Sequence, residues 1–425
     1  MQINYCGTVI FLTLLLAFTA KSQDTLTLSL QNAETRFLQE NLILMAERLN
    51  IDVKDAQIRQ ALMWENPEFT IEHQIINREE AGLFGFTNSD NTVFEIEQLI
   101  QIGGKRGRKA RLLELEKVHT EHKFDLLLRE FKRTLREAFF RLAFINRIEG
   151  MYHQQIDALD RILMSFEEQF ERGNIARLEV MRIRSLLLEL EQEYSEVLSD
   201  QHEAQNILKI LLQLQEEVPL PQLPQNIRAA TIQQNGLEIS ELNELAMVHR
   251  SDYRAALAAN DAAHQLLRFE RSNAVPDVEV GLVHDRFDGP IDNYFGLSLN
   301  FPLAFWNRNQ GNIQIARHQI LQTDLVASYQ RQGITHEIAQ TLTRYERATH
   351  LINRLDDTFE EDFSTIIEVL LRQYQQGDIR LIEFIDFYES FRDGVKRNYS
   401  IQEEYLQAVE ELNFTVGRDI FQFNF

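Results

Sequence analysis

Hydrophobic and polar positions follow two different periods along this chain, and the two periods recur in the same order in each half. From Leu30 to Met63 apolar residues recur every three or four positions, which predicts a helix. After Pro67 apolar and polar residues alternate, and a second alternating run follows the loop-forming stretch 82–91. We therefore predict a β-hairpin over residues 67–102, with one apolar and one polar face.

The helical period then returns and runs without a break. Apolar residues keep the spacing of three and four from Arg111 to Phe170, and at ~1.5 Å per residue this helix would be about 90 Å long. Leu178 to Leu214 predicts a second helix that runs back along the first. Helices of this length favour an elongated rod over a compact domain.

The second half of the chain repeats this order of elements. We expect a helix, a β-hairpin, a long helix and a returning helix over Leu242–Phe269, 276–302, Ile313–Tyr374 and Leu381–Phe414. Three prolines between positions 219 and 224 interrupt the pattern midway. We therefore expect a first structural repeat over residues 23–218, a linker over 219–240 and a second repeat over 241–425.

One short motif occurs in both halves, at the point where each long helix turns back. The first copy runs from Gln169 to Glu179 and the second from Gln373 to Glu383, each with an aromatic residue three positions before a glycine. Gly173 and Gly377 are followed by Asn and Asp, which predicts that one helix ends and the next begins there. Each copy is expected to form the tip turn of a helical hairpin, and the chain is an internal duplication.

The N-terminal residues predict a cleaved leader. Val9 to Ala20 is an apolar run with the length of a secretory signal and too short to cross a bilayer as a helix. Small residues precede Gln23, so we expect a signal peptide over residues 1–22. The single cysteine, Cys6, lies within it, which leaves the mature chain without a disulfide or a thiolate metal site.

Composition and candidate chemistry narrow the functional classes. The formal net charge of −22 argues against nucleic-acid binding, because a phosphate backbone selects basic surfaces. Residues 103–109 (GGKRGRK) lack the spacing of a phosphate loop, and we interpret them as a strand-to-helix junction with a basic collar. His119 and His122 are three apart on a helix, but without further ligands a solvated face is the favoured interpretation. We expect no enzyme activity, no cofactor and no metal site.

The four predicted strands are too few to form a closed structure in one chain. Each has about the length of a tilted transmembrane strand and one apolar face, and an open edge in lipid would leave backbone groups unpaired. A homotrimer would supply 12 strands. The predicted fold class is therefore mainly α, a long α-helical barrel with a small membrane β-barrel part, four strands per protomer, duplicated internally and closed as a trimer. The alternative is a soluble hairpin packed on helices.

Six motifs together resemble the outer membrane efflux protein (TolC) family, most closely its heavy-metal efflux branch. They are the two tip motifs, Asn66-Pro67-Glu-Phe, Glu97-Gln98 with Gly103-Gly-Lys-Arg106, Val275-Pro276-Asp-Val-Glu-Val-Gly281, and Phe301-Pro302 with Asn307-Arg-Asn-Gln-Gly311. The resemblance covers essentially the whole mature chain. It implies a trimeric conduit in the cell outer membrane that extends into the periplasm, contacts outer-membrane lipid and is docked through a periplasmic adaptor to an inner-membrane RND pump. The exported solutes would be cations, heavy metals or small toxic compounds.

The resemblance also implies a constriction at the periplasmic end. Tips of this family carry acidic residues six and nine positions after the glycine, which correspond here to Glu383 and Asp386. The first copy has Glu179 but Arg182 at the equivalent positions, so its acidic pair is only partial. We expect Tyr374 and Glu179 of the neighbouring hairpin to form a hydrogen-bonded pair that holds the tips closed. The alternative is that Glu383 and Asp386 are first-turn acids favoured by the helix dipole.

Two other functions fit the same pattern. The first is the outer-membrane outlet of a type I protein secretion system, which differs mainly in its partners. The second is a secreted structural coiled-coil protein that never enters a membrane.

Overall fold

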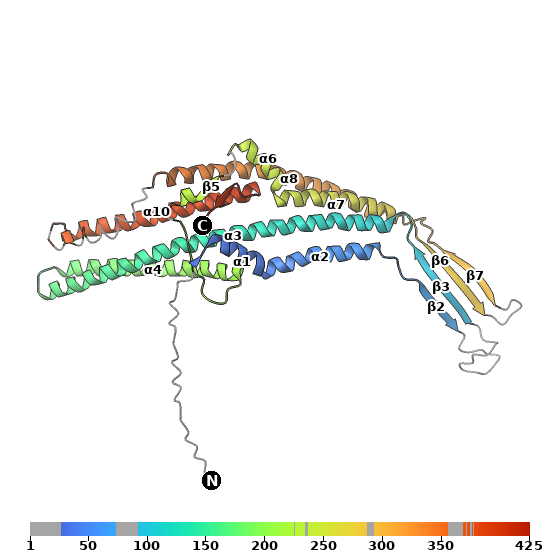
Figure 1. Ribbon diagram of the computed structural model, residues 1–425, viewed down its shortest axis with the longest axis horizontal. Coiled ribbons are helices and arrows are strands. Elements are labelled where there is room, and N and C mark those ends of the chain that lie inside the picture. The colour runs from blue at the N-terminus through green and yellow to red at the C-terminus, as the bar shows by residue number, and fades with distance from the viewer. Residues whose placement is uncertain are drawn as a thin grey trace, which may run out of the picture.

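The computed structural model describes residues 27–73, 92–224, 226–233, 237–286, 293–355, 369–370, 372–374, 376 and 378–425. The predicted leader with Cys6, the loop 82–91, Gly377 and most of the turn 287–293 lie outside these residues. The molecule is elongated, with a sheet at one end and helical tips at the other (Figure 1). The C-terminus lies near the middle.

The same order of elements occurs twice. The first set is α1 (Leu30–Glu40), α2 (Leu42–Leu62), β2 (Glu68–His73), β3 (Thr92–Ile100), α3 (Lys105–Glu171) and α4 (Arg177–Leu212). The second set is α6 (Ile239–His249), α7 (Ser251–Asn273), β6 (Val278–Arg286), β7 (Tyr294–Asn300), α8 (Gln310–Ile352) and α10 (Leu381–Val416). The mainly helical, internally duplicated fold with four principal strands is thus confirmed.

Short elements tie the two sets together at the middle of the molecule. The segment between them contains β4 (Leu220–Pro221), α5 (Ile227–Ala230) and β5 (Thr231–Gln233). β4 pairs in parallel with β1 (Thr27–Leu28), and β5 pairs antiparallel with β8 (Phe421–Phe423). Both ends of the described chain are therefore fixed to the segment that links the repeats.

Each predicted first helix is in fact two helices. The first is interrupted at Asn41, which is buried and extended, accepts a hydrogen bond from the Leu44 amide (3.0 Å) and donates one to the Leu211 carbonyl (3.1 Å). The second is interrupted at Arg250, which bonds Asp252 and Glu337. The prediction of two continuous helices was wrong, because the apolar period continues through both breaks.

α3 is the longest described element, with 67 residues and, at ~1.5 Å per residue, a length of about 100 Å. It begins at Lys105, earlier than the predicted Arg111, directly after Gly104 in the left-handed region (φ +69°). Near the sheet, α3 is part of a single layer of helices that pack in the order α2, α3, α7 and α8. α2 and α8 are the two edges of this layer.

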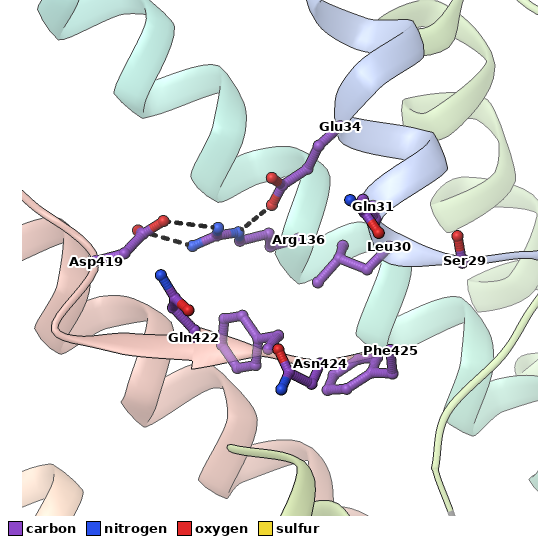
Figure 2. A pocket seen from close by; sticks show the side chains of 10 residues that line it. Ser29, Leu30, Gln31, Glu34, Arg136, Asp419, Gln422, Asn424 and Phe425 are labelled. Carbon is purple, nitrogen blue, oxygen red and sulfur yellow. Dashed lines mark hydrogen bonds and ion pairs between the residues drawn. The ribbon is translucent and has the colours of Figure 1, made fainter. Parts of the chain in front are cut away.

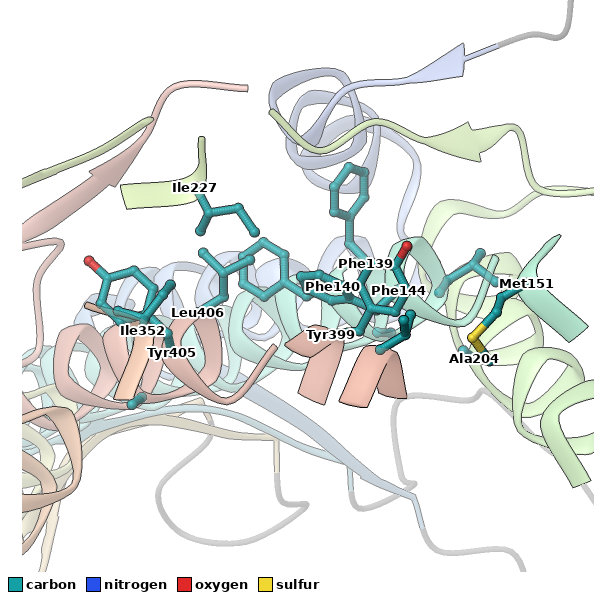
Figure 3. Packing of buried hydrophobic residues seen from close by; sticks show 14 of the residues in the cluster. Phe139, Phe140, Phe144, Met151, Ala204, Ile227, Ile352, Tyr399, Tyr405 and Leu406 are labelled. Carbon is teal, nitrogen blue, oxygen red and sulfur yellow. The ribbon is translucent and has the colours of Figure 1, made fainter. Parts of the chain in front are cut away.

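An aromatic cluster lies in the core where α3, α10 and the C-terminal strand meet. Phe139, Phe140 and Phe144 of α3 are completely buried, and Phe144 lies 6.3 Å from the ring of Tyr399 of α10 (Figure 3). Phe423 of β8 meets Phe140 edge-on at 5.2 Å. This aromatic cluster fixes the C-terminal strand against the long helix.

A buried ion network lies beside that cluster and joins four parts of the chain. Arg136 is only 4% exposed and contacts Glu34 of α1 at 2.6 Å, Glu410 of α10 at 2.5 Å and Asp419 at 3.1 Å. Figure 2 shows Arg136 between Glu34 and Asp419. Lys132 adds a second cation at 2.8 Å from Asp419.

The pKa values of two carboxyl groups in this network are shifted in opposite directions. Burial is the largest influence on Glu410 and raises its pKa to about 7, although the Arg136 charge opposes that change. Burial also acts to raise the pKa of Asp419, but Arg136 and Lys132 together lower it. The two cations are thus neutralised chiefly by Asp419 and Glu34, while Glu410 titrates near neutral pH.

Candidate functional site

The two tip turns share an equivalent backbone hydrogen bond. At the first tip the Asn174 amide donates to the Gln169 carbonyl (2.9 Å), the Gly173 amide donates to Phe170 (2.9 Å), and Gly173 is left-handed (φ +74°). This is a Schellman helix end, which glycine adopts without steric cost. At the second tip the Asp378 amide donates to the Gln373 carbonyl at the same distance, 2.9 Å. The described residues of the two copies thus share the hydrogen bond that closes the turn, while Gly377 itself lies outside them.

Each returning helix places a glutamate at the third position after its N-cap. α4 begins after Ala176 and contains Glu179, and α10 begins after Arg380 and contains Glu383. Glu383 accepts hydrogen bonds from the Arg380 amide (2.9 Å) and from the Arg380 guanidinium (2.8 Å). The side-chain bond and then the backbone bond lower the pKa of Glu383, which therefore stays ionised and paired.

Asp386, one turn further along α10, is exposed. Within one protomer the predicted acidic pair is therefore unequal, because Glu383 caps its own helix beside a cation while Asp386 faces outward. Arg380 was missed in the sequence, although its position three residues before Glu383 is the spacing of a capping box. Arginine is an unusual N-cap, so the spacing alone is a weak sequence signal for a capping box.

Tyr374 lies where the two helical hairpins meet. Its ring stacks on Phe166 of α3 at 5.2 Å and contacts Phe384 of α10 at 6.0 Å. Burial and then the nearby Glu179 carboxylate raise the pKa of Tyr374 to about 12. Tyr374 and Glu179 are thus brought together from different hairpins of one chain, whereas the hydrogen bond between them stays a prediction.

Sequence reasoning missed the two phenylalanines that hold Tyr374. Phe166 is four residues before Phe170 and so lies on the same helix face, and Phe384 directly follows Glu383. Beyond them Tyr388 is buried, and its hydroxyl donates to the Gln155 side chain at 3.1 Å. A continuous row of aromatic side chains therefore joins the first hairpin to the second near the tips.

At the other end of the molecule the four principal strands form one antiparallel sheet in the order β2-β3-β6-β7. Its apolar face is open to the surroundings, with Phe295 75% and Leu297 66% exposed. The same face carries Phe69, Ile71, Phe94, Ile96, Leu282 and Leu299, all exposed as well. Water-soluble sheets bury such a face, so this one requires an apolar environment or partner.

The opposite face of the sheet is acidic and polar. The strand register places Glu68 beside Glu97, Glu97 beside Gly281, and Gly281 beside Ser298 in one row across all four strands. An added Cβ at Gly281 would lie 2.2 Å from the Ser298 hydroxyl oxygen, so any larger residue here requires the Ser298 side chain to move. The neighbouring Ser298 donates to Glu95 at 3.3 Å.

A solvated face was the expectation for His119 and His122, but both side chains are partly buried. The Nδ1 atom of His119 lies 2.8 Å from the Ala255 carbonyl of α7, and His122 is half-buried 3.6 Å from Asp125. Burial and then Arg254 lower the pKa of His122. Both histidines pack between α3 and α7, and the described residues contain no group of three metal-ligating side chains.

None of the helices in the described part of the chain is both long and apolar enough to cross a bilayer.

Comparisons with known proteins give one family and one fold. Residues 242–418 match the family model of outer membrane efflux proteins. No curated protein sequence matches the chain.

Several solved structures share the fold at low sequence identity. A membrane protein from Pseudomonas aeruginosa is 15% identical with a TM-score of 0.73, covering 91% of this chain and 92% of that one. The Campylobacter jejuni CmeC outer membrane channel is 14% identical with a TM-score of 0.71, covering 92% and 86%. CusC is 15% identical with a TM-score of 0.70, covering 92% of each chain. The second repeat thus matches the outer membrane efflux protein family, and the chain as a whole shares the fold of these solved structures.

Proposed function

We propose that this chain is the outer-membrane channel of a tripartite efflux system. It would act as a passive conduit, without catalysis, for cations, heavy metals or small toxic compounds that leave the periplasm. One observation carries the proposal: the sheet and the helix layer of a single protomer both have open edges, and both carry exposed apolar surface.

The sheet supports insertion in the outer membrane. Its exposed apolar face suits lipid tails, and β2 and β7 are its edge strands. Edge strands in lipid need partners, because each unpaired backbone group is costly there. Pairing β7 of one copy with β2 of the next satisfies both edges, and three copies then supply 12 strands.

The edge helices support the same closure. Six of the 21 side chains of α2 are large, apolar and exposed, namely Leu42, Ile43, Met45, Leu49, Val53 and Leu62. α8 on the opposite edge exposes Leu321, Leu325, Val326 and Tyr329, with Leu325 at 72% and Tyr329 at 75%. Two different patches on opposite edges favour a head-to-tail contact, and such contacts close into rings. The edges of both layers thus support closure by further copies of the chain, and a homotrimer is the ring that we propose.

The polar face of the sheet would line the lumen. Its glutamates and the net charge of −22 favour cations in that space. The resemblance to the heavy-metal branch implies that the partners are a periplasmic adaptor and an inner-membrane RND pump. A heavy-metal cargo is consistent with an acidic lumen.

The tips would form the periplasmic constriction. Tyr374 sits between the hairpins next to Glu179, so a change in their spacing must disturb this contact. Asp386 is exposed near the same end, where copies of the chain would converge. We propose that Asp386 faces the constriction and that the contacts of Tyr374 hold it closed.

Assembly is tested by particle mass and cell fractionation. The full chain, expressed with its leader, should appear in the outer-membrane fraction, and the detergent-extracted particle should have three times the protomer mass by light scattering. A particle of one protomer would contradict the trimer. A chain found only in the soluble periplasmic or secreted fraction would favour the coiled-coil structural protein instead.

Export is tested by deleting the gene and challenging cells with divalent cations and with small hydrophobic toxicants. Sensitivity should rise and should be restored by the wild-type chain. Unchanged sensitivity, together with loss of a secreted protein from the medium, would favour a type I secretion outlet. Metal accumulation in the cells distinguishes the two classes of solute.

A further inference from the structure

We propose that the junction between sheet and helices is a docking surface for anionic phospholipid headgroups of the inner leaflet. The surface extends the basic collar predicted at residues 103–109 and consists of residues 105–111 of α3, Arg268 and Arg271 of α7, and Arg308 just before α8. This inference rests on the proposed membrane insertion of the sheet, and it names a lipid contact that the channel function does not require.

The basic collar has many positive charges in a chain that is negative as a whole. The net charge is −22, yet residues 105–111 contain five cations in seven positions. Arg268 and Arg271 at the end of α7 and Arg308 before α8 add three more. Contacts show that the three segments adjoin, since Arg108 donates to the Arg268 carbonyl at 3.2 Å and Asn309 donates to the Glu270 carbonyl at 2.8 Å.

Several of these cations have partners that leave their charge available. Arg106 lies 3.9 Å above the ring of Trp64, and Lys109 lies 5.3 Å from the ring of Phe269. Arg108 and Arg308 donate to backbone carbonyls of Arg268 and Ala304. Rings and carbonyls orient a guanidinium or ammonium group without neutralising it, so a phosphate can still bind. Lys105 and Arg111 differ, because they form ion pairs with Asp277 and Glu114, each at 2.7 Å.

Exposed aromatic and aliphatic side chains surround the same junction. Trp306 is 87% exposed, and Phe301, Leu303 and Phe305 beside it are exposed as well. Tryptophan with an apolar rim and adjacent arginines is the arrangement found at the headgroup level of a bilayer. The apolar face of the sheet ends here and the polar helix layer begins, so the collar lies at the expected depth for lipid phosphates.

Charge and depth together select the ligand. A zwitterionic headgroup offers little net attraction to a cluster of cations, whereas an anionic headgroup is attracted by each of them. Arginine binds phosphate oxygens through two parallel N–H bonds, and Arg106 and Arg108 are available for that geometry. The collar would fix the vertical position of the protein in the membrane.

Native mass spectrometry of the delipidated full-length protein tests the proposal. The protein is mixed with defined amounts of phosphatidylglycerol and phosphatidylcholine, and bound lipids are counted. Wild type should retain phosphatidylglycerol preferentially. Arg106→Gln/Arg108→Gln/Lys109→Gln should weaken that binding about five-fold for each cation removed. The matched control Arg161→Gln/Arg331→Gln/Arg347→Gln removes three exposed cations from the helices and should bind like wild type.

Two further arms separate the explanations. Arg106→Lys/Arg108→Lys keeps the positive charge and should retain most of the preference for phosphatidylglycerol. The weaker binding of the glutamine variant would then be due to the lost charge and not to misfolding. Inorganic phosphate at matched ionic strength should not displace the lipid, and displacement would mean that the collar recognises free phosphate instead. Equal binding of both lipids by wild type, or equal losses in the collar and control variants, would overturn the proposal. If the wild-type chain is absent from the membrane fraction, the proposed function itself has failed.

Discussion

At the level of single residues, the two acidic positions of the second tip have different roles. Glu383 is bound by the amide and guanidinium of Arg380, so its charge is compensated locally. Asp386 is exposed and carries its charge toward the surroundings. A carboxylate compensated in this way contributes less to the electrostatic potential of a pore than an uncompensated one.

This difference predicts unequal effects on ion selectivity. Asp386→Asn should weaken cation selectivity and block by multivalent cations more than Glu383→Gln does, as measured by single-channel recording in planar bilayers. Arg380→Gln should strengthen selectivity, because it exposes the Glu383 charge. Equal effects of Asp386→Asn and Glu383→Gln would contradict the assignment.

The contact of Tyr374 predicts a separate effect on opening. Tyr374→Phe keeps the packing against Phe166 and Phe384 but removes the hydroxyl next to Glu179, so open probability should rise several-fold with little change in conductance. Glu179→Gln should act in the same direction. Tyr345→Phe, a buried tyrosine far from the tips, is the control and should behave like the parent. A Tyr374→Phe channel with parental gating would place the closing contact elsewhere.

Glu410 predicts a pH dependence of stability. Burial raises its pKa from 4.5 to about 7, so between these values the folded chain binds more protons than the unfolded chain. Stability should therefore fall as pH rises through this interval. The lowered pKa of Asp419 acts in the opposite sense, but only at more acidic pH, around and below its unfolded value of 3.8. Glu410→Gln should flatten the dependence, and melting temperatures between about pH 5 and pH 8 would reveal it. A variant with the wild-type slope would assign that slope to other groups.

At the level of elements, the tip turns depend on the backbone freedom of glycine. Gly173 has φ +74° and open space around it, so Gly173→Ala should cost about 1–2 kcal/mol from the left-handed conformation alone. Gly150 also has open space but lies inside α3 with helical geometry, so Gly150→Ala should stabilise by about 0.5–1 kcal/mol. Opposite signs in denaturant unfolding would support this account, and equal signs would contradict it.

Elements with a long regular period could be predicted from the sequence. The four principal strands and the long helices are indicated by their hydrophobic period, and the turn at Gly173 is indicated by its glycine. The breaks at Asn41 and Arg250 could not, because their causes are a hydrogen bond to Leu211 and ion pairs with Asp252 and Glu337, which come from tertiary contacts. A side chain that bonds a residue far away in the sequence leaves no local signal.

The same limit applies to the site. The positions of Tyr374 and Glu179 followed from the repeated motif, and the structure brings them together. The pairing of Glu383 with Arg380 was within reach of sequence reasoning, whereas the stacking of Tyr374 on Phe166 requires knowing that the two hairpins lie side by side. The contact of His119 with α7 likewise depends on the packing of one repeat on the other.

At the level of the whole molecule, the edge of α8 predicts how assembly can be broken. Leu325→Asp places a charge on a surface proposed to meet α2 of the next copy, so the extracted particle should fall from trimer to protomer mass. Leu325→Met keeps the surface apolar and should leave the trimer intact. The folded content measured by circular dichroism should be equal in both, since Leu325 is 72% exposed within one chain. A trimeric Leu325→Asp particle would exclude this edge from the interface.

The pairing of β3 with β6 has a consequence for the width of the proposed channel. It joins the two hairpins into one four-stranded sheet, so a hairpin cannot be added or lost alone. Barrel diameter grows roughly linearly with strand number. Each copy gained or lost would therefore change the barrel by four strands at once. A duplicated chain thus needs fewer subunits to assemble, but the pore diameter can change only in large steps. Selection for solutes of slightly different size must then act through the side chains of the lumen and the tips.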